Sequence, residues 1–208
     1  MSVNTGSQIE PLEFWAWVQN HQMELARSQQ GSNSKAVDDA AAILHRYDPS
    51  LGFEVSTSNG CLEVTVTAFG QTESFGAVKT LVEACPTATG LKAIAFRQPE
   101  GSDFELEADG RTFSPQKTYF EPMKGRLDPR TVGLMIFFTD ADDVSDAARL
   151  RTARIMLQAI LGEYEAALRI DHVEVADTSG VELSKYIQLS KVGDYLSWVE
   201  KRNVRALQ

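Results

Sequence analysis

The pair Asn59-Gly60 is the feature of this sequence that most restricts its fold. It separates two runs, 51–55 and 62–66, in which apolar residues alternate with polar ones. Alternation with a period of two is typical of strands with one buried face, and Asn-Gly readily adopts the positive φ angles of a two-residue hairpin turn. The sequence therefore predicts an antiparallel hairpin at this place.

Helices are predicted on both sides of this hairpin. Apolar residues recur at helical spacing over 12–28 and again over 37–47, and the segment GSNS at 31–34 supplies an N-cap between them. A further helix is predicted at 73–85, closed by Pro86.

The run 91–97, LKAIAFR, follows this helix. Ile94 and Phe96 would face one side of a strand and two alanines the other, so both faces look covered. The sequence predicts a central strand whose hydrogen-bond ladder is ended by Pro99, which has no N–H to donate.

The second half of the chain repeats these signals. Acidic residues and an Asp109-Gly110 turn predict an exposed edge hairpin at 103–113. The other predicted elements are a hairpin of 117–123 and 131–139 joined by a loop with Gly125 and Pro129, a helix at 145–161, a strand at 168–175 and a C-terminal helix from Leu189. The strand at 131–139 is apolar on both faces and is predicted to be central.

These elements predict an α+β fold with a mixed, largely antiparallel sheet. We expect one domain over 1–208, with a helical hairpin at 1–48, a sheet core at 49–176 and a C-terminal helical extension at 177–208. The order strand, strand, helix, strand occurs at 51–97 and at 117–175. Two ββαβ units would produce this order, and so would a chance arrangement of common elements.

The charge balance excludes some classes of partner. The chain has 29 acidic and 20 basic residues and a net charge of -9, which repels phosphate backbones and anionic lipid surfaces. We therefore expect no nucleic-acid or membrane partner. No basic cluster precedes an apolar segment at the start, and no apolar run approaches the roughly 20 residues of a membrane helix, so a cytoplasmic location is expected.

Several short patterns resemble reactive motifs but lack the spacing that the chemistry needs. In GQTESFGAVKT at 70–80, Gly and Lys are not adjacent as a phosphate loop requires, and two Ser-x-x-Lys patterns have no companion motif. Cys61 and Cys85 form no CxxC pair, and His21, His45 and His172 form no HxxxH pair. We predict no catalytic residue, metal ligand or cofactor, and reduced cysteines.

Four aspartates crowd the turn between the predicted strand 131–139 and the following helix. A calcium loop would need glycine and glutamate where this chain has Ser145 and Arg151. The aspartates are interpreted as capping and dipole-complementing residues of the helix. The other interpretation is a binding patch for a basic partner, made of Asp140, Asp142, Asp143 and Asp146.

Arg97 stands at the exit of the apolar run 91–97. An arginine at a strand end can pair with a carboxylate or with free carbonyls of the sheet margin, which is the favoured interpretation. The alternative is that Arg97 faces a ligand, since clefts form at strand ends in parallel sheets.

Four segments together resemble a family of bacterial α+β proteins with no known function. They are FWAWVQNHQ at 14–22, HRYDPSLGFEV at 45–55, the stretch from LVEACP to AIAFRQP at 81–99, and LGEYEA at 161–166. The family resemblance implies an aromatic first helix, an AFR-type strand and a late LGEY segment. It implies no activity, cofactor or site.

Two hypotheses on function follow. The first is a non-catalytic module that binds a basic protein through the aspartates and Arg97, one version being an immunity protein that neutralises a basic toxin. The alternative is a small enzyme or small-ligand binder with a cleft near Arg97, Tyr119 or Trp15.

Overall fold

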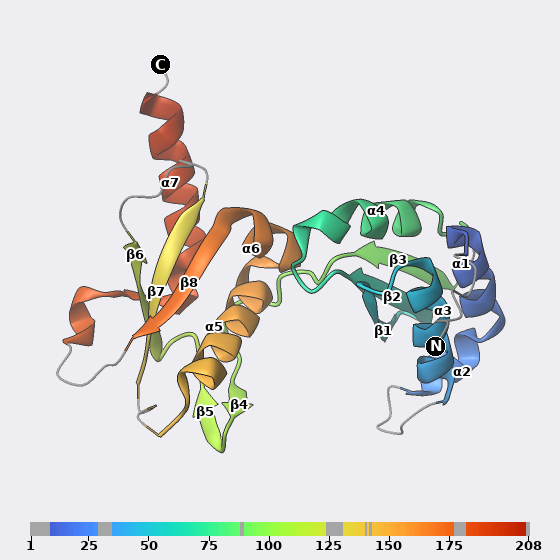
Figure 1. Ribbon diagram of the computed structural model, residues 1–208, viewed down its shortest axis with the longest axis horizontal. Helices are drawn as coiled ribbons and strands as arrows, with labels where there is room; N and C mark the ends of the chain where they lie inside the picture. The colour runs from blue at the N-terminus through green and yellow to red at the C-terminus, as the bar shows by residue number, and fades with distance from the viewer. Residues whose placement is uncertain are drawn as a thin grey trace, which may run out of the picture. The chain divides into compact units, whose positions relative to one another are not determined.

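The computed structural model describes residues 9–28, 35–87, 90–123, 131–139, 141, 143–176 and 182–206. The chain forms two compact units, Met1–Arg97 and Gln98–Gln208, called unit 1 and unit 2 below. Helices and mixed sheets of mostly antiparallel strands make up both (Figure 1), which confirms the predicted α+β class. That the chain acts as a single domain stays a prediction.

Three helices open unit 1: α1 (Pro11–Asn20), α2 (Gln22–Ser28) and α3 (Lys35–Tyr47). The prediction of one helix over 12–28 is wrong, because the helix breaks at His21, where φ is -118°. The His21 N–H donates to the Val18 carbonyl. In a continuous α-helix it would donate to the Trp17 carbonyl, which instead lies 2.8 Å from Nδ1 of the His21 ring. The predicted N-cap at 31–34 lies outside the described residues.

The sheet of unit 1 contains β1 (Gly52–Ser58), β2 (Cys61–Thr67) and β3 (Leu91–Ala95) in the order β1-β2-β3. β1 and β2 are antiparallel, with Asn59 and Gly60 at φ angles of 51° and 75°, so the predicted hairpin is confirmed. After a 3-10 turn at Thr72–Ser74, α4 (Phe75–Glu83) carries the chain to β3, which pairs parallel with β2.

The prediction that 91–97 forms a central strand is wrong. β3 stands at the edge of the described sheet, and on its outer face Lys92 pairs with Glu63 at 2.8 Å. The strand also ends earlier than predicted: Phe96 has a φ of 65°, which turns the chain before Pro99 is reached. Two covered faces were inferred from apolar residues alone, yet Ile94 on the outer face is only half-buried.

Unit 2 begins with a hairpin of β4 (Leu106–Ala108) and β5 (Arg111–Phe113), as predicted from Asp109-Gly110. The remaining elements, in chain order, are β6 (Thr118–Met123), β7 (Val132–Phe138), α5 (Asp146–Leu161), α6 (Glu163–Arg169), β8 (Ile170–Ala176), η2 (Leu183–Lys185), β9 (Ile187–Gln188), η3 (Leu189–Lys191) and α7 (Val192–Ala206). The loop predicted around Gly125 and Pro129 lies outside the described residues.

The main sheet of unit 2 has the order β8-β7-β6-β9, so β7 is central as predicted. β6 and β7 are antiparallel, and β8 pairs parallel with β7 after the helices α5 and α6. Unit 1 shows the same arrangement, an antiparallel hairpin whose second strand pairs parallel with a strand beyond a helix. The ββαβ order read from the sequence is therefore present in both units.

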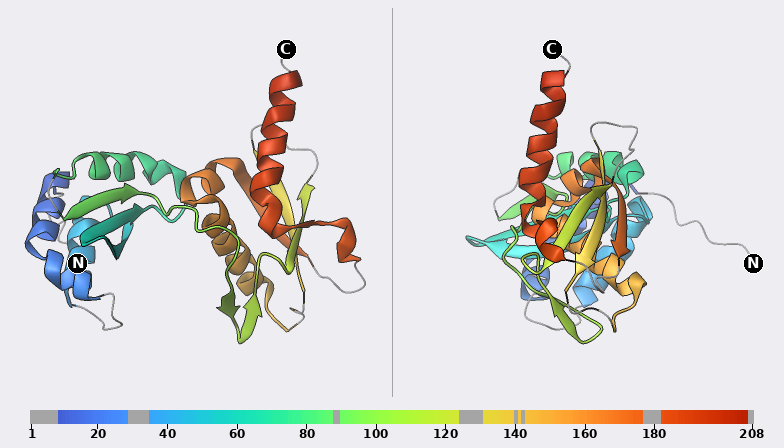
Figure 2. Two further views of the ribbon diagram at one scale, coloured as in Figure 1. Left: turned by 180° about the vertical axis from the view of Figure 1, so that it is seen from behind. Right: turned by 90° about the vertical axis from the view of Figure 1, so that its left-hand side faces the viewer.

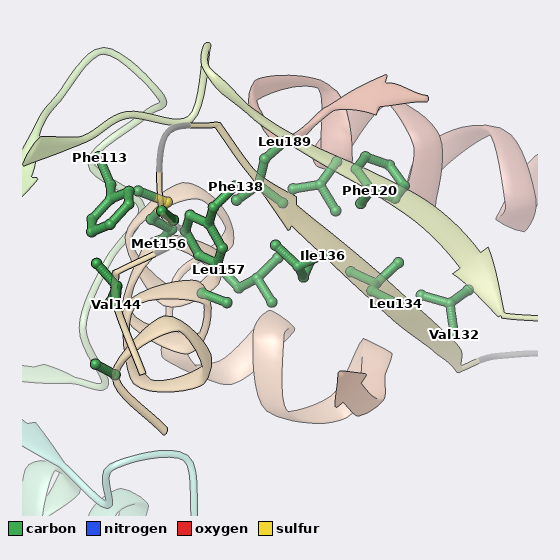
Figure 3. Packing of buried hydrophobic residues seen from close by; sticks show 14 of the residues in the cluster. Phe113, Phe120, Val132, Leu134, Ile136, Phe138, Val144, Met156, Leu157 and Leu189 are labelled. Atoms are coloured by element: carbon green, nitrogen blue, oxygen red, sulfur yellow. The ribbon is translucent and has the colours of Figure 1, made fainter. Parts of the chain in front are cut away.

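The core of unit 2 lies between one face of this sheet and the helices α5 and α7. Figure 3 shows alternate β7 side chains packing with Met156 and Leu157 of α5 and with Leu189. Ala148 and Ala153 are also buried on this side of α5, whereas Ala147 is exposed. In both views of Figure 2 the later part of α7 extends beyond the sheet.

Candidate functional site

The second face of the unit 2 sheet is the candidate site. Cross-strand register places Glu121 of β6, Met135 of β7 and Glu174 of β8 in one row. The next row contains Tyr119 and Phe137. Because side chains alternate between the two faces of a strand, all of these point away from the buried cluster that α5 and α7 cover.

This face is accessible in the described part of the chain. Tyr119 and Met135 are half-buried, and Glu121 and Glu174 are exposed. Phe137 is buried, because the ring of Tyr186 covers it at a centroid distance of 4.3 Å. The open face is defined below as Tyr119, Glu121, Met135, His172 and Glu174.

The charge of the open face is mainly negative. His172 Nε2 lies 2.7 Å from Glu174 Oε1, two residues along β8 on the same face. Among the described residues Glu121 forms no ion pair, so its carboxylate faces solvent uncompensated. Met135 thus lies between two carboxylates, and the ring of Tyr119 lies in the adjoining row.

The two described aspartates of the predicted acidic patch each pair with an arginine. Both Asp143 oxygens accept hydrogen bonds from Arg111 of β5, with Nη2 and Oδ2 2.7 Å apart. Asp146 pairs with Arg149, one turn further along α5. Asp140 and Asp142 lie outside the described residues. The helix N-cap is Ser145, whose hydroxyl accepts a hydrogen bond from the N–H of Ala148 at 3.3 Å.

The hydrogen bonds from Arg111 hold the pKa of Asp143 below its ordinary value. A lowered pKa in the folded state contributes stability above the unfolded pKa, and this contribution is lost as the pH falls through the folded pKa. We expect Arg111→Ala to raise the Asp143 pKa toward 3.8, its unperturbed value. Carboxyl NMR titration measures this change, with Arg111→Lys as the variant that retains charge but loses the two-pronged geometry. An unchanged Asp143 titration in Arg111→Ala would contradict the assignment.

Arg97 is engaged within unit 1 in the way its structural interpretation predicts. Its Nε–H donates to Glu54 Oε1 at 2.7 Å, and its guanidinium lies 5.5 Å from the centre of the Phe69 ring. That ring packs over Gly52, where an added Cβ would meet it at 2.3 Å. Arg97 and Phe69 thus stack over Gly52, the first residue of β1.

Of the residues grouped with Arg97 in the cleft hypothesis, Trp15 cannot line a cleft. Trp15 is fully buried in unit 1, and its Nε1–H donates to the Leu81 carbonyl at 2.6 Å. Tyr119 belongs to the open face of unit 2. Trp15 is therefore not accessible to a ligand.

Cys61 and Cys85 are free thiols, and burial raises the pKa of the Cys85 thiol. His45 is exposed near the end of α3. Within the described ranges no group of three or more His, Cys, Asp or Glu side chains could hold a metal ion.

The open face is not among the sites that the sequence predicts. The run at 131–139 is apolar on both sides and predicts a central strand, but its second side carries only Gly133, Met135 and Phe137. Two glutamates of the neighbouring strands, Glu121 and Glu174, lie on that same side. Their charge is the sequence signal that indicates an open face.

Comparisons of the chain with protein-family models, with curated proteins and with solved structures find no match. No helix in the described ranges is long and apolar enough to cross a membrane.

Proposed function

We propose that this chain is a non-catalytic module that binds a basic partner protein through the open face. The observation that carries the proposal is the row Glu121, Met135, Glu174, with Tyr119 beside it in the adjoining row. Methionine and tyrosine are enriched in protein interfaces, where they supply contact area. Two flanking carboxylates select for positive charge on the partner.

The charge of the whole chain supports the same class of partner. A net charge of -9 attracts a cationic protein during diffusion and speeds association at low salt. An immunity protein that neutralises a basic toxin is one version of this function. The acidic turn contributes less to it, because arginines already neutralise Asp143 and Asp146.

Paired charge reversals test the proposal. The purified chain captures proteins from a lysate of the source cells at low and high salt, side by side with Glu121→Lys/Glu174→Lys. The matched control is Glu105→Lys/Glu107→Lys, which makes the same charge change at two exposed glutamates of unit 2. We expect the wild type and the control to capture a basic protein that high salt releases. This protein should associate with the open-face variant at least about tenfold more slowly than with the wild type.

Two outcomes would contradict the proposal. One is equal capture of the basic protein by the open-face variant and the control. The other is a captured partner that is acidic or whose binding does not respond to salt.

A further inference from the structure

The outer edge of β1 has backbone groups available for pairing. Ser58 and Cys61 flank the two-residue turn and therefore exchange hydrogen bonds, so the alternation along an antiparallel pair turns the N–H and C=O of Phe53 and Val55 away from β2. Within the described residues the outward N–H and C=O groups of Phe53 and Val55 have no hydrogen-bond partner. An unpaired strand edge is a template for another strand.

β1 is also the least protected of the outer strands in the described sheets. β8 carries Asp171 and Glu174, and the register of its ladder shifts beside Val132. β3 has five residues and ends at the turn of Phe96. β1 has seven residues in regular register, no proline, and Glu54 as its sole charge. Charges, bulges and short length are the usual protections of an edge, and β1 has few of them.

The shared ββαβ order shows how the corresponding edge is used in unit 2. β6 has the same place in its ββαβ order as β1 has in unit 1, and its outer edge pairs antiparallel with β9 through Tyr119 and Phe120. In the described part of unit 1 no strand takes the place of β9. The fold therefore accommodates an antiparallel strand at this position.

We propose that β1 pairs antiparallel with β1 of a second copy of the chain, with Val55 opposite Val55. This register aligns all seven residues and places Glu54 opposite Ser56 and Phe53 opposite Thr57. A register shifted so that Glu54 faces Glu54 would set like charges directly against each other, which is unfavourable. The strand is thus complementary to itself in one register.

Pairing would also complete the burial of two apolar side chains. Phe53 and Val55 are half-buried, whereas their partners in β2, Val66 and Val64, are fully buried. On the other face the single charge of β1 is held in place, since Arg97 donates to Glu54. Two sheets of three strands would become one continuous sheet of six. This inference goes beyond the proposed function and uses a surface in the other unit.

Disulfide trapping tests the register directly. In the proposed pair the two copies of residue 55 exchange both backbone bonds, which sets their Cα atoms about 5.5 Å apart and within the range that a disulfide spans. Val55→Cys, in a background of Cys61→Ser and Cys85→Ala, should therefore form a covalent dimer under mild oxidation. Thr57→Cys lies on the same face but is offset by four residues from its copy, about 13 Å, and should not.

Sedimentation of the full chain over a range of concentrations tests the association without a crosslink. We expect the wild type to dimerise and Val55→Lys, which sets two lysines opposite each other, to dimerise at least about tenfold more weakly. Ser56→Lys adds the same charge one residue away, opposite Glu54, and should preserve the dimer. Circular dichroism shows that each variant is folded.

Three results would overturn the proposal. If the wild type stays monomeric at every concentration, a second copy of the chain does not bind this edge. A dimer that Val55→Lys leaves intact places the interface elsewhere. Equal crosslinking of Val55→Cys and Thr57→Cys rejects the register. Binding of a basic protein through the open face is unaffected by any of these results, so the two proposals fail separately.

Discussion

Replacing Trp15 with alanine is expected to destabilise unit 1 by about 3–5 kcal/mol. The indole is fully buried, packs edge-on against Phe14 with ring centres 5.0 Å apart, and donates from Nε1 to the Leu81 carbonyl at 2.6 Å. Truncation leaves a large cavity between α1 and α4 and an unsatisfied carbonyl at its wall. Both effects lower the free energy of unfolding.

Urea unfolding followed by circular dichroism measures this change. Trp15→Phe keeps most of the ring volume and loses the hydrogen bond, so its loss should lie between wild type and Trp15→Ala. Trp198→Ala is the matched control, because Trp198 is 52% exposed on α7 and its removal should change stability by about 0.5 kcal/mol or less. Similar losses for Trp15→Ala and Trp198→Ala would contradict the placement of Trp15 in the core.

The adjacent residues Ile155 and Met156 of α5 should respond very differently to alanine. Met156 is fully buried and its sulfur lies 3.9 Å from the Thr118 hydroxyl, whereas Ile155 is 53% exposed. We expect Met156→Ala to lower the free energy of unfolding of unit 2 by about 2–5 kcal/mol. Ile155→Ala should change it by about 0.5 kcal/mol or less, and alanine's higher helix propensity favours the variant.

Thermal and urea unfolding of the two variants under identical conditions measure the difference. The pair is well matched, since both side chains are aliphatic in character, of similar size, and on one helix. If Ile155→Ala proves the more damaging change, the placement of Met156 on the buried side of α5 is wrong.

The parts of the fold that could be predicted are those specified by short segments. Asn59-Gly60 and Asp109-Gly110 adopt positive φ angles within their own turns, so both hairpins follow from a few residues. The ββαβ order could also be read, because each element has its own periodicity. These signals need no knowledge of what packs against them.

The errors arose where the outcome depends on a contact that apolar spacing does not show. The helical spacing of 12–28 is continuous, and the break depends on one side chain, His21, bonding the Trp17 carbonyl. β3 is apolar enough for a central strand, and its position at the edge depends on which strands pair beside it. The pattern of apolar residues indicates that a residue is buried, but it does not indicate which element covers that residue.

The candidate site shows the same division. Arg97 was placed at a strand end, and its pairing with a carboxylate follows from the favoured interpretation. The neutralisation of Asp143 could not be read, because Arg111 lies 32 residues away along the chain. The open face of unit 2 depends on the register of three strands, which only the folded sheet reveals.

The sheet of unit 1 has a consequence for how the protein is made. Its described strands all come from the first 97 residues, and β3, the last of them, ends at Ala95. Domains usually fold as they leave the ribosome, the N-terminal one first. All described strands of the unit 1 sheet, and Trp15 with the Leu81 carbonyl that it bonds, are therefore available for folding before residues 98–208 have been translated.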